Sequence, residues 1–195
     1  MPDEPLILLK GERIGLGPLR RDLLDTYTRW VNDMRVTRTL NLPSRPHTFE
    51  QQVQWVDKAL VSATDIIFTI YILESMQPIG NVGLHDIDHD SGTAEFGILI
   101  GEVDAWGMGY GTEATRLIVS YGFDVLGLHN IDLECYGNNP AGVKAYERAG
   151  FKHVGRRRGA KKIGRERVDI IIMDILASEV EPTDLHHLMQ TGNKT

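Results

Sequence analysis

The stretch Trp106-Gly107-Met108-Gly109-Tyr110-Gly111-Thr112-Glu113-Ala114 decides the fold of this 195-residue chain. It lies between a predicted strand at 93–100 and a predicted helix at 112–124. Glycines at alternate positions let the backbone approach a ligand without obstruction by Cβ atoms. The free N–H groups and the dipole at the start of the following helix favour an anion, most naturally a phosphate or diphosphate. The same glycines also suit a tight turn that holds no ligand.

Phosphate-binding loops fall into classes that the spacing of the glycines can separate. A Walker A loop is excluded, because no Gly-Lys-Ser/Thr follows. The dinucleotide fingerprint G-x-G-x-x-A is satisfied by Gly109, Gly111 and Ala114, and Asp132 follows about 20 residues later. The context disfavours a dinucleotide-binding oxidoreductase, since several residues separate Ile100 from the glycines and too little chain follows for a doubly wound sheet. The oxidoreductase stays an alternative.

Beyond the loop, the sequence predicts one mixed α/β domain at 1–176 and a polar, loosely docked tail at 177–195. Apolar runs and alternation predict strands at 6–9, 14–18, 66–72, 79–84, 93–100 and 130–136, with a closing hairpin at 151–176. Apolar residues at helical spacing predict helices at 20–34, 48–63, 112–124 and 140–149.

Composition narrows the class of protein. The net charge of -6 and a pI near 5.6 disfavour a nucleic-acid-binding protein, which must neutralise phosphates. No apolar stretch approaches the roughly 20 residues of a membrane helix, and the N-terminus is acidic where a secretory signal is basic. The single cysteine, Cys135, cannot form an intramolecular disulfide, and no second thiol exists for a zinc cluster. We therefore expect a cytoplasmic protein with no metal site and no membrane partner.

Two blocks of sequence resemble one family. The glycine loop resembles the acetyl-CoA pyrophosphate loop of the GNAT superfamily of N-acetyltransferases, whose pattern is Gln/Arg-x-x-Gly-x-Gly/Ala. Trp106 stands in the Gln/Arg place, a form familiar in the RimJ/RimL-like branch, which is named for ribosomal-protein N-terminal acetyltransferases. The second block, Asn139-Pro140-Ala141-Gly142-Val143-Lys144-Ala145-Tyr146-Glu147-Arg148-Ala149-Gly150-Phe151, resembles the late Asn…Tyr-Glu-Lys/Arg-x-Gly-Phe helix of the family. Asn139 also suits the N-cap of that helix.

The resemblance implies both a fold and an activity. The fold is a GNAT-like mixed, mostly antiparallel twisted sheet of about seven strands, with helices on both faces and a splay between 93–100 and 130–136. The activity is acetyl transfer from acetyl-CoA, the co-substrate, to a primary amine, and the branch suggests a protein N-terminal α-amine. A small-molecule amine such as a polyamine or aminoglycoside is an alternative acceptor. A CoA-binding module without turnover and a homodimer are also open.

Direct acetyl transfer requires a base for the amine proton and an acid for the departing thiolate. Glu95, on the strand before the loop, is the candidate base, acting directly or through a water. RimJ/RimL-like proteins often carry an acidic residue here, although a surface carboxylate is the alternative interpretation. Tyr146 is the candidate acid, since the resemblance places its phenol near the CoA sulfur. Its alternative role is an aromatic side chain that covers the core.

The cofactor site that the resemblance implies is made mostly of backbone groups. The strand edge at 98–100 is expected to bind the pantetheine arm and to polarise the acetyl carbonyl. Asn139 is expected to contact the same arm while capping its helix. The predicted cofactor-binding residues are Ile98, Leu99, Ile100, Trp106, Gly107, Met108, Gly109, Tyr110, Gly111, Thr112, Asn139 and Tyr146.

Three other features of the sequence carry less functional weight. Cys135 alternates with apolar residues, which favours a buried core thiol over a nucleophile. His186 and His187 lie in the polar tail without partner ligands, so we expect solvent exposure. Basic residues at 156–167 could attract the 3′-phosphate of CoA, an acidic peptide or RNA, or could simply be a solvated hairpin.

Overall fold

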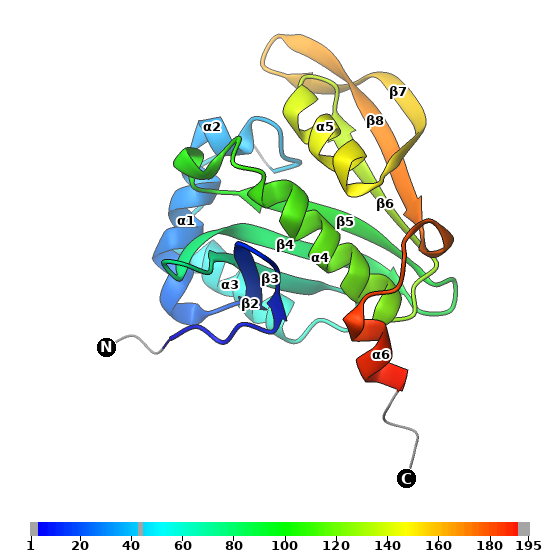
Figure 1. Ribbon diagram of the computed structural model, residues 1–195. Helices are drawn as coiled ribbons and strands as arrows, with labels where there is room; N and C mark the ends of the chain where they lie inside the picture. The colour runs from blue at the N-terminus through cyan, green and yellow to red at the C-terminus, as the bar shows by residue number, and fades with distance from the viewer. Residues whose placement is uncertain (1–3, 43–44, 191–195) are drawn as a thin grey trace.

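A computed structural model describes residues 4–42 and 45–190 (Figure 1). The strands are β1 (Leu9–Lys10), β2 (Ile14–Pro18), β3 (Ile66–Ile72), β4 (Gln77–Asp88), β5 (Thr93–Ile100), β6 (Asn130–Tyr136), β7 (Lys152–Ile163) and β8 (Glu166–Leu176). The α-helices are α1 (Leu24–Asn32), α2 (Met34–Thr37), α3 (Phe49–Leu60), α4 (Tyr110–Asp124), α5 (Pro140–Ala149) and α6 (Asp184–Gln190). Short 3-10 helices are η1 (Arg21–Leu23), η2 (Val103–Ala105) and η3 (Ala177–Glu179).

The strands form a single mixed sheet. In the part of the chain that the structure describes, eight strands lie in the order β1-β2-β3-β4-β5-β6-β8-β7. Every neighbouring pair is antiparallel except β5 and β6, which are parallel. The mostly antiparallel sheet that the sequence predicts is therefore confirmed, with eight strands where about seven were expected.

Helices cover both faces of the sheet (Figure 1). On one face, α4 and α5 pack against the larger of two hydrophobic cores, which includes the buried Ala114 and Ile118. On the other face, α1 and α3 enclose a smaller core built from Tyr27, Trp30 and Val56. Within residues 4–42 and 45–190, no helix is both long and apolar enough to cross a membrane.

The sheet opens between β5 and β6. Their pairing covers three positions, Thr93 with Asn130, Ala94 with Ile131 and Glu95 with Asp132. From there the rest of β5 pairs only with β4, and the rest of β6 pairs only with β8. The splay predicted between 93–100 and 130–136 is therefore confirmed. Because a parallel pair that ends early leaves one edge of each strand unpaired, backbone groups are exposed inside the sheet.

The segment predicted as one helix at 20–34 is broken into η1, α1 and α2. The break occurs at Asp33, whose backbone is extended (φ -84°, ψ 111°). Its carboxylate accepts the backbone N–H of Arg35 at 2.8 Å and so acts as the N-cap of a new helix. The apolar residues do follow the predicted helical spacing, but the Asp33 side chain competes with the helix for backbone N–H groups, ends α1 and turns the chain.

Element boundaries elsewhere follow local signals closely. Strands β3, β5 and β6 and helix α5 have the predicted limits, whereas β1 is shorter than the predicted strand at 6–9 and β4 is longer than that at 79–84. In the C-terminal segment, α6 lies against α4, and Thr183 donates its hydroxyl to Asp124 at 2.6 Å. Residues 191–195 of the predicted tail lie outside the described residues.

Candidate active site

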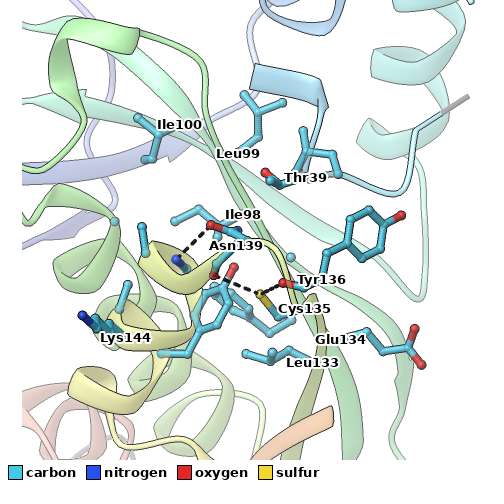
Figure 2. A pocket seen from close by; sticks show the side chains of 18 of the residues that line it. Thr39, Ile98, Leu99, Ile100, Leu133, Glu134, Cys135, Tyr136, Asn139 and Lys144 are labelled. Carbon is cyan, nitrogen blue, oxygen red and sulfur yellow. Dashed lines mark hydrogen bonds between the residues drawn. The ribbon is translucent and has the colours of Figure 1, made fainter. Parts of the chain in front are cut away.

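A cavity of about 690 Å³ lies where β5 and β6 diverge. Its walls come from both strands, the loop at 106–112, the start of α5 and the segment after α2. Figure 2 shows side chains from each side of this cavity: Ile98, Leu99 and Ile100 of β5, Cys135 of β6, and Asn139 beside α5. The predicted cofactor residues on separate elements are thus brought together around one cavity.

The glycine loop has the backbone geometry of an anion site. Gly107 and Gly109 have φ values of 74° and 84°, in the left-handed region that glycine adopts without strain. Helix α4 begins at Tyr110, two positions before the predicted start at 112, and its first hydrogen bond runs from the Glu113 N–H to the Gly109 carbonyl at 3.1 Å. The preceding N–H groups of the first turn have no acceptor within the helix, and Gly111 is among the residues that line the cavity.

Arg13, which the sequence reasoning missed, holds this loop in place. Its guanidinium donates to the Met108 carbonyl at 2.8 Å and pairs with Glu113 at 3.2 Å. It also lies over the Tyr110 ring, 5.1 Å from the centroid. The first residues of α4 are therefore fixed from the turn between β1 and β2. No local pattern could indicate this contact, because Arg13 and Glu113 are 100 residues apart.

Trp106 and Met108 anchor the loop to neighbouring elements. The indole N–H of Trp106 donates to the Ile100 carbonyl at 2.9 Å, which ties the loop to the end of β5. Met108 is 57% exposed and does not line the cavity; its carbonyl is the group that Arg13 binds. Of the loop residues predicted to bind cofactor, 106–107 and 109–112 line the cavity.

Tyr146 lines the same cavity from α5. Its ring packs edge-on against Phe96 and Phe151, at centroid distances of 5.7 and 6.2 Å. Its hydroxyl forms no hydrogen bond with any residue in the described part of the chain. Burial raises the pKa of Tyr146 well above its ordinary value, so the phenol stays protonated in neutral solution and has a proton to donate.

Asn139 and Cys135 stand beside each other where β6 leads into α5. The Asn139 side chain accepts the Gly142 N–H at 3.0 Å, as the predicted cap requires. The Cys135 thiol lies 3.7 Å from the Tyr136 carbonyl oxygen, and burial raises the pKa of the thiol to about 11. A neutral, buried thiol of this kind is a core residue, which agrees with the sequence interpretation.

Glu95 lies at the point where β5 and β6 part. It is in register with His85 of β4 on one side and with Asp132 of β6 on the other. Burial raises the pKa of Glu95, the carboxylates of Asp132 and Glu134 raise it further, and His85 lowers it. A carboxylate with a raised pKa binds a proton more strongly, which suits a general base.

A second cavity, of about 490 Å³, lies between β4 and β5 and the helices α1 and α3. Its walls include the aromatic residues Tyr27, Trp30 and Trp55. It shares five lining residues with the first cavity: Leu40, Asn41, Gly97, Ile98 and Leu99. The two cavities therefore meet along β5, directly beside Glu95.

Residues 40–41, after α2, line both cavities and contact the hairpin formed by β7 and β8. Asn41 accepts a hydrogen bond from the Lys161 ammonium at 2.7 Å and one from the Tyr136 hydroxyl at 3.4 Å. Elsewhere on the hairpin, Arg156 pairs with Asp169 and Arg157 pairs with Glu134. The predicted basic hairpin is thus partly neutralised, and Lys161 and Arg157 face the first cavity.

His186 and His187 of the tail differ in their surroundings. His186 lies 3.9 Å from Asp124 on α4 and is half-buried, whereas His187 is exposed. Among the residues that the structure describes, no group of three or more metal-ligating side chains comes together.

Comparison with known proteins agrees with this geometry. A family model described as "Acetyltransferase (GNAT) domain" matches residues 13–152, which include the glycine loop, Glu95 and Tyr146. The chain belongs to the GNAT acetyltransferase family. As a GNAT acetyltransferase, it is an acyltransferase that depends on acetyl-CoA.

Relatives of this GNAT chain are similar over most of their length. The uncharacterized N-acetyltransferase p20 of Bacillus licheniformis is 26% identical over 175 residues, covering 88% of this chain and 97% of that protein. Human alpha/beta-tubulin-N-acetyltransferase 9 is 25% identical over 159 residues, covering 75% of this chain and 76% of that protein. The crystal structure of spermidine N-acetyltransferase from Vibrio cholerae, in complex with CoA and spermine, has a TM-score of 0.80 at 24% identity, covering 87% of this chain and 98% of that chain.

Proposed function

We propose that this GNAT enzyme transfers the acetyl group of acetyl-CoA directly to the primary amine of a small molecule. The observation that carries the proposal is the junction at 97–99, where the two cavities share a wall of β5. Acetyl-CoA occupies the first cavity and the amine occupies the second. The two reactants then meet without a covalent enzyme intermediate, which agrees with the neutral state of Cys135.

The diphosphate of CoA binds at the start of α4 in this proposal. The unpaired N–H groups and the dipole of α4 attract its charge, and left-handed backbone at Gly107 and Gly109 clears the approach. The pantetheine arm follows the unpaired edge of β5 at 98–100, opposite Asn139. Lys144 and Arg148, which line the same cavity, add positive charge for the remaining phosphate.

The chemistry assigns one proton transfer to each candidate residue. Glu95 takes a proton from the ammonium, and the free amine attacks the thioester carbonyl carbon. The new C–N bond forms, the C–S bond breaks, and Tyr146 donates a proton to the leaving thiolate. The nitrogen of the new amide gives up its second proton to solvent water, and water returns a proton to the Tyr146 phenolate. The raised pKa of Glu95 supports its role, since a stronger base accepts the amine proton more readily. Burial keeps the Tyr146 phenol protonated, so a proton is present for the thiolate.

A small-molecule acceptor is supported by the size of the second cavity, about 490 Å³, and by a structural neighbour named for spermidine. A protein N-terminal α-amine is the acceptor class that the RimJ/RimL-like branch suggests, and membership of that branch stays a prediction. The name of the human relative, which refers to tubulin, keeps a protein acceptor open as a second candidate.

A panel of acceptors tests the proposal. The purified protein is incubated with acetyl-CoA and either small primary amines or short peptides with free N-termini, and released CoA thiol and product masses are measured. We expect one acetylated small amine for each thiol released. Thiol release without an acetylated product, or CoA binding without thiol release, would contradict the proposed activity. Acetylation of peptides alone would assign the protein-acceptor class instead.

A further inference from the structure

The second cavity, in which the proposed acceptor binds, contains no carboxylate among the described residues that line it. The side chains there that can carry a positive charge are Arg45, His47 and His85. His85 is paired with Asp65 at 3.1 Å. Arg45 forms no ion pair with any carboxylate in residues 4–42 and 45–190. The local charge therefore favours an anionic ligand over a cationic one.

A buried amide on α3 also has no partner. Gln52 is 6% exposed and lines the second cavity, and its side chain hydrogen-bonds to no residue in the described part of the chain. The neighbouring Gln51 side chain, in contrast, completes the cap of α3 with Thr48. The Gln52 amide atoms are not among the fully buried polar atoms without a partner in the described residues, so they face the open cavity. The Gln52 amide is thus available to a ligand inside the cavity.

The first cavity offers a counterion for one ammonium group. Glu95 and Glu134 are the carboxylates among the described residues that line it. Glu134 is already paired with Arg157. Glu95 remains, and it is the carboxylate that the proposed mechanism assigns to the reacting amine. A second ammonium group on an acceptor that reaches into the second cavity would meet Arg45 and no carboxylate among the described residues that line it.

We infer that the acceptor is a primary amine whose far end carries a carboxylate, which the Gln52 amide and the Arg45 guanidinium bind. This inference rests on the proposed function and narrows its substrate class. Glu95 faces the reacting ammonium group, and the opposite end of the molecule carries the opposite charge. Amines with two or more positive charges are then poor acceptors.

Three amines of similar length, which differ in the charge of the group at the far end, test which charge the acceptor site prefers. 5-Aminopentanoate, pentylamine and cadaverine carry a carboxylate, a methyl group and a second ammonium at the far end, respectively. The triplet β-alanine, propylamine and 1,3-diaminopropane repeats the comparison on a shorter chain. We expect kcat/KM to fall in the order carboxylate, methyl, ammonium, with roughly 10-fold or more between the first and the last.

Two variants test the assigned residues. Gln52→Glu keeps the side-chain shape and adds a negative charge, so it should reverse the order and make the diamine the best substrate of each triplet. Arg45→Gln should lower kcat/KM for the carboxylate-bearing amines and change that for pentylamine less than about 2-fold. Gln77→Glu is the matched control, because Gln77 is exposed at the start of β4 and lines neither cavity. It should leave the order unchanged.

A binding measurement separates this inference from the proposed function. Calorimetric titration of the CoA-bound protein with the same six amines reports affinity without turnover. If no amine is acetylated, the proposed function fails, and the order of affinities still decides the inference. Diamines that bind or react as well as the carboxylate-bearing amines would overturn it. So would a Gln52→Glu variant that folds, as judged by circular dichroism, and keeps the original order.

Discussion

Tyr146 and Glu95 both have raised pKa values, but the physical causes differ. Tyr146 is surrounded by Phe96 and Phe151, so burial alone is the main cause. The Glu95 side chain is exposed, and its shift comes from partial loss of solvent contact together with the charges of Asp132 and Glu134. The acid is thus fixed in its neutral state by packing, whereas the base responds to its charged neighbours. The two side chains can therefore be tested by different kinds of substitution.

At Tyr146, replacement by Phe removes the hydroxyl and keeps the ring contacts. We expect Tyr146→Phe to lower kcat by roughly 10²-fold, the lower end of what general acid catalysis contributes, with a smaller change in acetyl-CoA affinity. Steady-state kinetics and equilibrium titration with acetyl-CoA measure the two quantities. Tyr121→Phe is the control, since Tyr121 also packs edge-on against a phenylalanine but lines neither cavity. Unchanged kcat in Tyr146→Phe would remove Tyr146 from the mechanism.

At Glu95, the predicted effect appears in the pH dependence. A base must be deprotonated, so kcat/KM should fall as pH drops through the pKa of Glu95, which lies above the ordinary carboxylate value. Asp132→Asn removes a neighbouring negative charge, lowers the pKa of Glu95 and should move this acidic limb to lower pH. Glu95→Gln should abolish the limb together with most of the activity. An acidic limb that stays in place in Asp132→Asn would contradict this assignment of the base.

At the scale of elements, the segment 101–109, which connects β5 to α4, is held in place at both of its ends. Glu102, just after β5, accepts hydrogen bonds from the Trp30 indole at 2.9 Å and from Arg29 at 2.5 Å. Gly101 is necessary for this contact, because a Cβ there would lie 2.1 Å from the Trp30 ring. Helix α1 therefore holds the start of this segment through Trp30, and Arg13 holds its end through the Met108 carbonyl.

Loss of the Arg13 contacts should affect the cofactor more than the chemistry. We expect Arg13→Gln to raise the KM for acetyl-CoA about 5-fold, since a half-exposed ion pair contributes on the order of 1 kcal/mol, and to change kcat less. Arg21→Gln, which removes an exposed ion pair with Asp57 far from the loop, should leave both constants unchanged. A KM for acetyl-CoA that is equal in the two variants would contradict the assigned role of Arg13.

Some elements could be predicted from the sequence because their signals are local. Asn139 caps α5 and Gly150 ends it at φ 110°, both within a turn of the helix that they define. The break at Asp33 depends on a choice between a helical and a capping conformation, which the helical spacing of apolar residues does not encode; here the Asp33 carboxylate accepts the Arg35 N–H and caps a new helix. The contact of Arg13 with Met108 depends on how distant strands are placed, which periodicity does not encode.

At the scale of the whole molecule, the predicted splay and the loop were within reach of sequence reasoning, and the second cavity was not. The loop is contiguous, so its glycines could be read directly. The second cavity draws Gln52 from α3, Trp30 from α1 and Asn81 from β4, and no motif connects these residues. Acceptor specificity is therefore a property of the assembled fold and could be read only from the structure.

Acetyl-CoA should stabilise the whole domain. A ligand that binds only the folded state adds about 2.7 kcal/mol of unfolding free energy at 100 times its Kd. Thermal unfolding with and without acetyl-CoA measures this shift, and NAD at the same concentration should have no effect. Equal protection by NAD would contradict selective binding of acetyl-CoA at the loop 106–112.

The short parallel pairing of β5 with β6 is the seam that joins the two halves of the sheet, and it ends at Glu95, the proposed proton acceptor. The last of the three pairs joins Glu95 to Asp132, so a carboxylate that adds to the effect of burial in raising the pKa of Glu95 belongs to the opposite half of the sheet. Any spreading of the halves weakens this repulsion and with it the proton affinity of Glu95. Glu95 is therefore a stronger base when the two halves of the sheet are paired here and a weaker base when they separate.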